Sequence, residues 1–221
     1  NGNDLTYDGN STRLLPGSAP GSIPWDAFDV DIVIDSTGVY RKKKQLQLHL
    51  DSGARRVLVT KPPADEIDRI VIQGINQDKI NSKDQIISTT SSTTQVLALM
   101  LKVLDQNFGI ENAMMTNVHA YTSDQPLADS VRSDLRRSRS AVENIIPNET
   151  WAPDYVSQLL PKFKNKISGM AMNVPVANGS CVDLTTEMFS MPSIEEVNNA
   201  FKDASENELI DLIRYTEDLS L

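Results

Sequence analysis

The sequence has few of the residues that build metal centres and covalent cross-links. One cysteine, Cys181, and two histidines, His49 and His119, occur in 221 residues. A single cysteine forms no internal disulfide, which indicates a reducing intracellular compartment, the cytoplasm or an organelle. One thiol and two imidazoles are also too few for a cysteine-based metal cluster or a multi-histidine zinc site.

Long apolar runs and an excess of positive charge are missing as well. No run of about 18 apolar residues occurs, so we expect no membrane span, and the polar start at Asn1–Asp4 lacks a signal-peptide pattern. The formal net charge of −9 argues against a general nucleic-acid-binding protein. With 39% hydrophobic and 23% charged residues, the composition is typical of a globular chain of one large or two small domains.

The first part of the chain alternates short apolar runs with one helical pattern. Residues 1–24 are rich in Gly, Pro, Ser and Asn and predict a loop, with one weak strand over 11–15. A helix is predicted over 42–53, where Gly53 ends it. Apolar, β-branched runs predict buried strands over 29–35, 55–60, 70–72 and 85–87. This order of strands around a helix predicts a parallel α/β sheet.

The longest helical pattern begins the second part of the chain. It covers residues 91–107 with a broad apolar face, and Gly109 follows its end. A strand predicted over 115–121 then enters a polar segment at 122–144. That segment is too long for an ordinary connection, which indicates a functional loop or an interface.

The last third shows two strand patterns and two helix starts. Strands of antiparallel type are predicted over 168–174 and 180–191. Cys181 lies in the second of them and is expected to be buried like a small hydrophobic residue. Capping boxes predict two helix N-termini, at Ser193 with Glu196 and at Ser205 with Glu208.

A hydroxyl cluster between a predicted strand and the long helix is the first candidate for chemistry. Ser92 would lie at or just before the helix N-terminus, where free N–H groups and the helix dipole favour an anion and activate a nucleophile. The residues alone favour a simpler interpretation, in which Ser91 or Ser92 is an ordinary N-cap. His119, on an apolar strand, is either a satisfied core residue or a general base.

Four arginines form the strongest positive patch of this acidic chain, and all lie in the polar segment: Arg132, Arg136, Arg137 and Arg139. Two interpretations stay open. The patch binds phosphate or RNA, or it pairs with carboxylates across a subunit interface. Because no aromatic residues interleave the arginines, we favour the interface.

Stretches over nearly the whole chain match one known family in order. They are Pro24-Trp25, VDIVIDSTGVY at 30–40, HLDSGARRVLVT at 49–60, Gly74-Ile75-Asn76, residues 86–104, VHAYTSDQ at 118–125, DLRRSRSAVENIIP at 134–147, Val174-Pro175, Val182–Leu184 and residues 195–212. On these residues the chain resembles the glyceraldehyde-3-phosphate dehydrogenase family, including its erythrose-4-phosphate relatives. The Asp-Leu-Arg-Arg run is similar to the bacterial and plastid branch.

The resemblance implies a fold class and a division into domains. The chain would be α/β, with the second half of a Rossmann-type NAD-binding domain over 1–91. The mixed α/β catalytic domain of the family would follow over 92–221, incomplete at its C-terminus. No G-x-G-x-x-G cradle occurs in the 221 residues. We therefore expect no cofactor in this chain, and NAD only if the family's N-terminal half exists.

The resemblance also implies a site. The family oxidises an aldehyde with a nicotinamide cofactor through a cysteine thioester, which phosphate cleaves. Ser92 matches the nucleophile position, His119 the base, and the loop over 122–144 the S-shaped loop of the tetramer core, with its four arginines at the interface. The phosphate-site positions are Ser91, Thr93, Thr122, Thr150 and Asn173. The positions near the cofactor are Ser36, Thr37 and Gly38.

The chain departs from the family pattern at three of these positions. Where the family reads Ser-Cys-Thr-Thr-Asn, this chain reads Ser-Ser-Thr-Thr-Gln at 91–95. The family's substrate-phosphate arginine is replaced by Asn173, and its Thr-Gly by Thr150-Trp151. An alcohol is a far weaker acid than a thiol, and a neutral amide binds an anion less strongly than a guanidinium.

These departures predict a catalytically degenerate family member. We expect it to have a structural or interaction role, with other protein subunits in a larger assembly or as a homo-oligomer through the loop over 122–144. The alternative is an active enzyme whose cofactor half lies outside the sequence given. That enzyme would be either an aldehyde dehydrogenase of the family type or an acyl enzyme based on Ser92.

Overall fold

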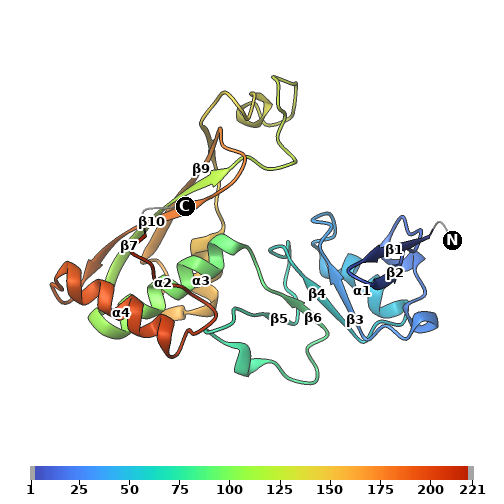
Figure 1. Ribbon diagram of the computed structural model, residues 1–221, viewed down its shortest axis with the longest axis horizontal. Coiled ribbons are helices and arrows are strands. Elements are labelled where there is room, and N and C mark those ends of the chain that lie inside the picture. Colours follow the sequence, from blue (N-terminus) through green and yellow to red (C-terminus); the bar gives the residue numbers. More distant parts are fainter. Residues whose placement is uncertain (1–2, 219–221) are drawn as a thin grey trace. The chain divides into compact units, whose positions relative to one another are not determined.

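The computed structural model describes residues 3–218, which fold into two compact units (Figure 1). The first unit contains Asn1–Val71 and Asp78–Thr90, and the second contains Ile72–Gln77 and Ser91–Leu221. Within the described part, no helix is long and apolar enough to cross a membrane. The parallel sheet of the first unit and the mixed sheet of the second confirm the predicted α/β class.

The first unit opens with a β-hairpin that the sequence analysis did not predict. Strands β1 (Asp4–Tyr7) and β2 (Asn10–Arg13) pair antiparallel. Asp8 and Gly9 connect them with positive φ angles of 47° and 77°, as a two-residue hairpin turn requires. The weak strand predicted over 11–15 corresponds to β2, whereas β1 and the hairpin pairing were missed, although the Asp-Gly dipeptide is a hairpin signal.

Four parallel strands and one helix make up the rest of the first unit. The strands lie in the order β3-β4-β6-β5. Their bounds are β3 Ile32–Asp35, β4 Arg56–Val59, β5 Arg69–Ile70 and β6 Ile86–Ser88, with the helix α1 at Lys43–Asp51. The four predicted strands and the helix of this region are confirmed, with β3, β4 and β5 shorter than expected and β6 shifted by one residue.

One face of the parallel sheet packs against α1. Leu46 of α1 is buried with Val57, Val59 and Ile86 of the sheet, and Ile67 completes this cluster. Alternate residues of β3 face the other way. Ile32 and Ile34 there are 55% and 61% exposed, although strands of parallel sheets are usually covered on both faces.

The second unit combines a long helix with a mixed four-stranded sheet in the order β10-β7-β9-β8. Their bounds are α2 Ser92–Phe108, β7 Ile110–Ala120, β8 Ile146–Asn148, β9 Ile167–Val174 and β10 Cys181–Met188. Strand β10 pairs antiparallel with β7, as predicted. Strand β9 runs antiparallel to β8 and parallel to β7, so its prediction as a strand of antiparallel type is confirmed for one neighbour and wrong for the other.

Two further helices complete this unit, α3 (Ala152–Leu159) and α4 (Ile194–Glu206). The capping box of α4 is confirmed, since the Ser193 hydroxyl accepts from the Glu196 amide and the Glu196 carboxylate accepts from the Ser193 amide. The second predicted helix start was wrong. Ser205 lies inside α4, and its hydroxyl donates to the Lys202 carbonyl instead of capping a new helix.

The core of the second unit lies between α2 and the sheet. Leu97 and Leu101 of α2 are buried with Met115 of β7 and Val156 of α3. Cys181 is exposed, so the prediction of a buried thiol was wrong. It is the first residue of β10, an edge strand whose alternate residues are exposed.

Candidate functional site

The start of α2 is an N-cap of ordinary geometry. Ser91 has extended backbone angles, and its hydroxyl accepts from the amide of Thr94 at 3.2 Å. The hydroxyls of Ser91 and Thr94 also lie 2.8 Å apart. Ser91 is therefore the N-cap, and Ser92 is the first helical residue, exposed at the positive end of the helix dipole.

The residue before this cap holds a strained backbone. Thr90 is buried and has a φ of 61°, which is uncommon for a β-branched residue. Its amide donates to the Ser88 hydroxyl at 3.0 Å. Strain of this kind collects at functional sites, which makes the turn before Ser92 a candidate for one.

His119 lies on β7, two residues beyond a contact with the first turn of α2. Asn117 donates its side-chain amide to the Thr93 hydroxyl at 3.1 Å, which ties β7 to the helix start. The His119 Nδ1 lies 2.7 Å from the Ala120 carbonyl. Because a carbonyl only accepts, Nδ1 carries the proton, and Nε2 of the neutral ring is left as a base.

Asn173 lies opposite His119 in the β7–β9 register and is buried in neutral contacts. Its amide nitrogen donates to the Ala120 carbonyl at 3.2 Å, and its oxygen accepts from Asn148 at 3.1 Å. Both ends of the Asn173 side chain are thus hydrogen-bonded to uncharged groups. No cation stands at this position of the register.

Thr150 precedes the start of α3. Its hydroxyl accepts from the Ala152 amide at 3.3 Å, and the Trp151 side chain is 61% exposed at the N-cap position. Asp154 lies in the first turn of α3. Its negative charge occupies the helix end that would otherwise attract an anion.

The polar segment over 122–144 binds three of its four arginines through its own acceptor groups. Arg137 pairs with Asp124, whose backbone carbonyl also accepts from Arg132. Arg139 pairs with Asp129 at 3.2 Å. The Arg136 side chain has no hydrogen bond or ion pair within residues 3–218.

Thr122, at the base of this segment, also belongs to that network. Its hydroxyl donates to Asp124 and its amide donates to Gln125. Burial would raise the pKa of Asp124, but the Thr122 hydroxyl and Arg137 together lower it. The carboxylate is therefore held in its charged form.

In the first unit, the turn that follows β3 contains the predicted cofactor positions. Asp35, the last residue of β3, accepts from both the amide and the hydroxyl of Thr37, at 3.0 and 2.7 Å. Thr37 in turn accepts from the Val39 amide, and Gly38 has a φ of 72°, which favours glycine. Ligands of parallel α/β sheets bind at this carboxyl end of the strands.

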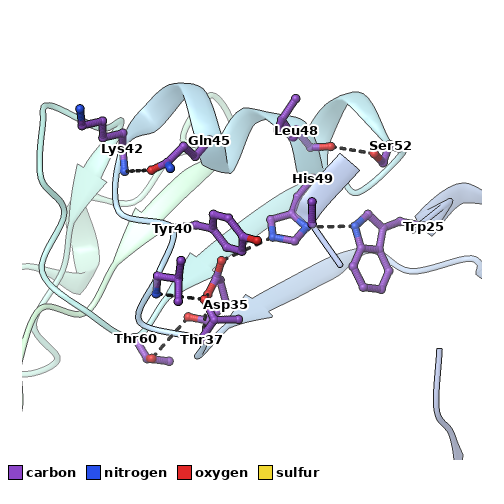
Figure 2. Close-up of polar contacts among 12 residues, drawn as sticks. Trp25, Asp35, Thr37, Tyr40, Lys42, Gln45, Leu48, His49, Ser52 and Thr60 are labelled. Carbon is purple, nitrogen blue, oxygen red and sulfur yellow. Dashed lines mark hydrogen bonds and ion pairs between the residues drawn. The ribbon is translucent and has the colours of Figure 1, made fainter. Parts of the chain in front are cut away.

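A histidine on α1 faces Asp35 from the other side (Figure 2). His49 Nε2 lies 3.5 Å from the second carboxylate oxygen of Asp35, and His49 Nδ1 accepts from the Trp25 indole N–H at 3.1 Å. Burial lowers the pKa of His49, and Asp35 offsets part of this effect. Sequence reasoning had not assigned Trp25, Asp35 or His49 to a site.

The structure places the predicted residues in two separate groups. The second unit holds those at the starts of α2 and α3, on β7 and β9, and in the polar segment, while the first unit holds only the turn after β3. Within the second unit, side-chain bonds join β7 to the start of α2 and to β9. Among the residues described, no cluster of His, Cys, Asp and Glu fits a metal ion.

Comparison with known proteins identifies relatives of this chain. The family model "Glyceraldehyde 3-phosphate dehydrogenase, C-terminal domain" matches residues 91–221. The chain is 45% identical over 215 residues to a glyceraldehyde-3-phosphate dehydrogenase of Streptomyces avermitilis, which covers 97% of this chain and 64% of the relative. The corresponding enzyme of Geobacillus stearothermophilus is 42% identical, over 99% of this chain and 65% of the relative. The chain thus spans somewhat less than two thirds of their length.

Proposed function

Because the chain belongs to the glyceraldehyde-3-phosphate dehydrogenase family, we propose that it is a member without phosphorylating dehydrogenase activity. Its role would be that of a protein subunit in a larger assembly. The observation that carries this proposal is Ser92, an alcohol at the first turn of α2, where the family resemblance requires a thiol. The relatives are named as dehydrogenases, so the proposal separates this chain from them.

The chemistry of Ser92 supports the loss of the first step. A helix N-terminus lowers the pKa of a thiol by a few units, enough to produce a thiolate near neutral pH. The same shift leaves an alcohol protonated, since alcohols are far weaker acids. An ester formed on Ser92 would also transfer its acyl group to phosphate less readily than a thioester.

The surroundings of the phosphate positions support the loss of anion binding. Asn173 is hydrogen-bonded to Asn148 and to a backbone carbonyl, so its neutral amide is already satisfied. Asp154 adds a negative charge to the first turn of α3. A substrate phosphate would therefore find an uncharged amide at one position and a repulsive carboxylate at the other.

A nicotinamide dinucleotide enters this proposal only through the first unit. Ser36, Thr37 and Gly38 are the residues that would contact it, because they end β3 where such ligands bind. The missing Cβ of Gly38 leaves the backbone approachable. When bound, the nicotinamide would accept hydride. In the family that step follows attack by a thiolate, which this chain does not supply at position 92.

The partner surface in the proposal is the segment over 122–144. Two of its four arginines, Arg137 and Arg139, are paired with carboxylates of the same segment. It exposes four large apolar side chains, which are Leu127, Val131, Leu135 and Val142. Exposed apolar side chains gathered in one segment fit a protein interface better than they fit RNA.

The decisive assay follows NAD reduction with glyceraldehyde 3-phosphate and inorganic phosphate. The protein tested contains this chain together with any cofactor half it has in the cell. We expect no turnover above background. Turnover at rates typical of enzymes, about 1–1000 per second, would overturn the proposal.

A second candidate function is acyl transfer through Ser92. The observation in its favour is the His119 tautomer, which leaves Nε2 as a base. Against it, Ser92 makes no side-chain hydrogen bond to His119 within residues 3–218, and a serine nucleophile needs such a base. Modification of Ser92 by a serine-directed acylating probe, abolished in His119→Ala, would favour this function over the first.

The interface is tested by sedimentation of the wild-type chain and of Leu135→Asp. We expect the wild type to associate and the variant to dissociate. The exposed Ile210→Asp, outside the segment, serves as the control and should leave association unchanged. A monomeric wild type would exclude the homo-oligomer, and capture of RNA lost in Arg136→Gln would favour nucleic-acid binding instead.

A further inference from the structure

A chain of polar side chains runs through the interior of the first unit. It joins the 3₁₀ helix at Trp25–Phe28 to α1 and to the end of β3, as Figure 2 shows. Trp25 donates to His49 at 3.1 Å, His49 faces Asp35 at 3.5 Å, and Asp35 accepts twice from Thr37. The chain therefore ends on the turn that lies at the ligand-binding edge of the sheet.

The tryptophan determines which nitrogen of His49 carries the proton. An indole N–H only donates, so the His49 Nδ1 that receives it must be unprotonated. The proton of the neutral ring is then on Nε2, directed at the carboxylate of Asp35. Trp25 thus selects the one neutral tautomer in which His49 offers an N–H to Asp35.

The facing atoms are buried and have no other hydrogen-bond partner. Asp35 is 4% exposed and His49 6% exposed. Within the described part of the chain, neither Asp35 Oδ2 nor His49 Nε2 makes a hydrogen bond. Their separation of 3.5 Å is longer than the usual 2.7–3.2 Å for N–H···O. A buried polar atom without a hydrogen-bond partner destabilises the fold. Each of these two atoms therefore depends on the other to offset the cost of its burial.

The other oxygen of Asp35 explains what this contact achieves. It holds the amide and the hydroxyl of Thr37, and the Asp35 carbonyl accepts from the amide of Thr60 at the end of β4. If the carboxylate rotated, the turn would lose both Thr37 bonds at once. A partner on the second oxygen prevents that rotation.

We propose that His49 and Asp35 are positioning residues for the turn Ser36–Val39, with Trp25 selecting the tautomer of His49. The proposal rests on the proposed function only in treating this turn as the ligand-binding end of the sheet. An ordinary buried network would tolerate either tautomer. A positioning device requires the Nε2 proton, because only that proton faces Asp35.

Nitrogen-15 NMR of histidine-labelled full chain tests the tautomer directly. At neutral pH we expect His49 to be neutral with its proton on Nε2. His119 is the internal control and should show the opposite form, with the proton on Nδ1. A His49 that is charged, or protonated on Nδ1, would overturn the proposal.

Amide hydrogen exchange at Thr37 and Val39 tests the positioning. His49→Ala removes the group that faces Asp35, and we expect exchange at these amides to accelerate by about tenfold or more. His49→Gln keeps an N–H at the same reach and should stay within about twofold of the wild type. Asp31→Asn, an exposed carboxylate just before β3, is the matched control and should have no effect.

A third variant tests the proposal even if His49→Ala does not fold. Asp35→Asn preserves size, but an amide cannot accept from both Thr37 and His49, so exchange at Thr37 should again accelerate. Exchange at Leu58 in β4 should stay unchanged if the unit is intact. Equal exchange in wild type and Asp35→Asn, or His49→Gln as fast as His49→Ala, would overturn the proposal. None of these measurements uses turnover, so an active dehydrogenase would refute the proposed function and leave this result standing.

Discussion

The turn after β3 and the start of α2 both follow a strand of the parallel sheet, yet different chemistry holds them. The turn depends on a buried carboxylate, Asp35, whose two oxygens have separate partners. The helix start depends on the Ser91 hydroxyl. A buried carboxylate persists only where its partners satisfy it, whereas a serine N-cap occurs at many helices. The first unit thus keeps a specialised polar arrangement, and the second begins its main helix in an ordinary way.

The largest effect is expected where α1 meets the segment that carries Trp25. Gly53 has a φ of 103°, and a Cβ there would lie 2.7 Å from the Asp26 amide nitrogen. In Gly53→Ala the two segments must separate, which also moves Trp25 away from His49. We expect the free energy of unfolding to fall by about 3 kcal/mol or more, measured by urea denaturation.

Gly9→Ala is the matched control for this prediction. Gly9 also has a positive φ, 77°, but nothing lies within 4 Å of the added Cβ. Only the backbone strain remains, and the loss should be about 1 kcal/mol. Equal losses in the two variants would show that the approach of Asp26 to Gly53 contributes little to the unit.

The next prediction concerns the start of α2. In a Cys181→Ser background, Ser92→Cys places a thiol at the positive end of the helix, which lowers its pKa below the ordinary value of about 8.5. We expect iodoacetamide to alkylate it about tenfold faster than Cys181 of the wild type at neutral pH. Alkylation no faster than that of the exposed Cys181 would mean that the helix start no longer activates a nucleophile of any kind.

A smaller effect follows from the buried histidine of the first unit. Burial lowers the pKa of His49 in the folded chain, and the facing carboxylate of Asp35 offsets part of the shift. The unfolded chain, with a histidine pKa of about 6.5, then binds more protons. The contribution of His49 to the free energy of unfolding is therefore fully present above about pH 6.5. It decreases as the pH falls toward the pKa of His49 in the folded chain.

Urea denaturation between about pH 8 and pH 5 measures this dependence. Acidic groups also titrate near the lower end of this range, so His49→Gln is the reference. Its stability should fall less over the same interval. Identical pH dependence in both proteins would show that His49 has the same proton affinity in the folded and unfolded chain.

The smallest prediction compares two helix caps of the second unit. Ser91 caps α2 and Ser193 caps α4, each through a bond of 3.2 Å to an amide three residues later. Substitution of either by alanine should cost about 1 kcal/mol in the free energy of unfolding. A much larger loss for Ser91→Ala would indicate that the strained turn at Thr90 depends on this cap. The start of α2 would then resemble the turn after β3 in having a specialised polar arrangement.

Helices and strands with strong local patterns could be predicted from the sequence. The helix α2 has a broad apolar face and a glycine after its last turn, so its bounds shifted by only one residue. The hairpin of β1 and β2 was missed because its strands are exposed and polar, which removes the apolar alternation. The parallel direction of β9 depends on a partner more than 40 residues earlier in the chain, which a local pattern does not encode.

From the residues alone, Ser92, His119 and the arginine patch could be singled out, and the family resemblance added the phosphate and cofactor positions. The chain of polar side chains formed by Trp25, His49 and Asp35 has no signal in the local sequence, because its members lie on three separate elements. It arises where the end of α1 meets the segment before β3. Cys181 was placed wrongly because a free cysteine is usually buried, while its exposure follows from its place at the start of β10, at the edge of the sheet.

The segment between β7 and β8 has a practical consequence for handling the protein. Its Arg139 is exposed, and trypsin cleaves the peptide bond that follows an accessible arginine. The conformation of the segment depends on ion pairs such as that of Arg139 with Asp129. Salt weakens pairs of this kind by screening. The rate of tryptic cleavage after Arg139 should therefore rise with ionic strength. A partner bound to this segment would slow the cleavage and could be detected in that way.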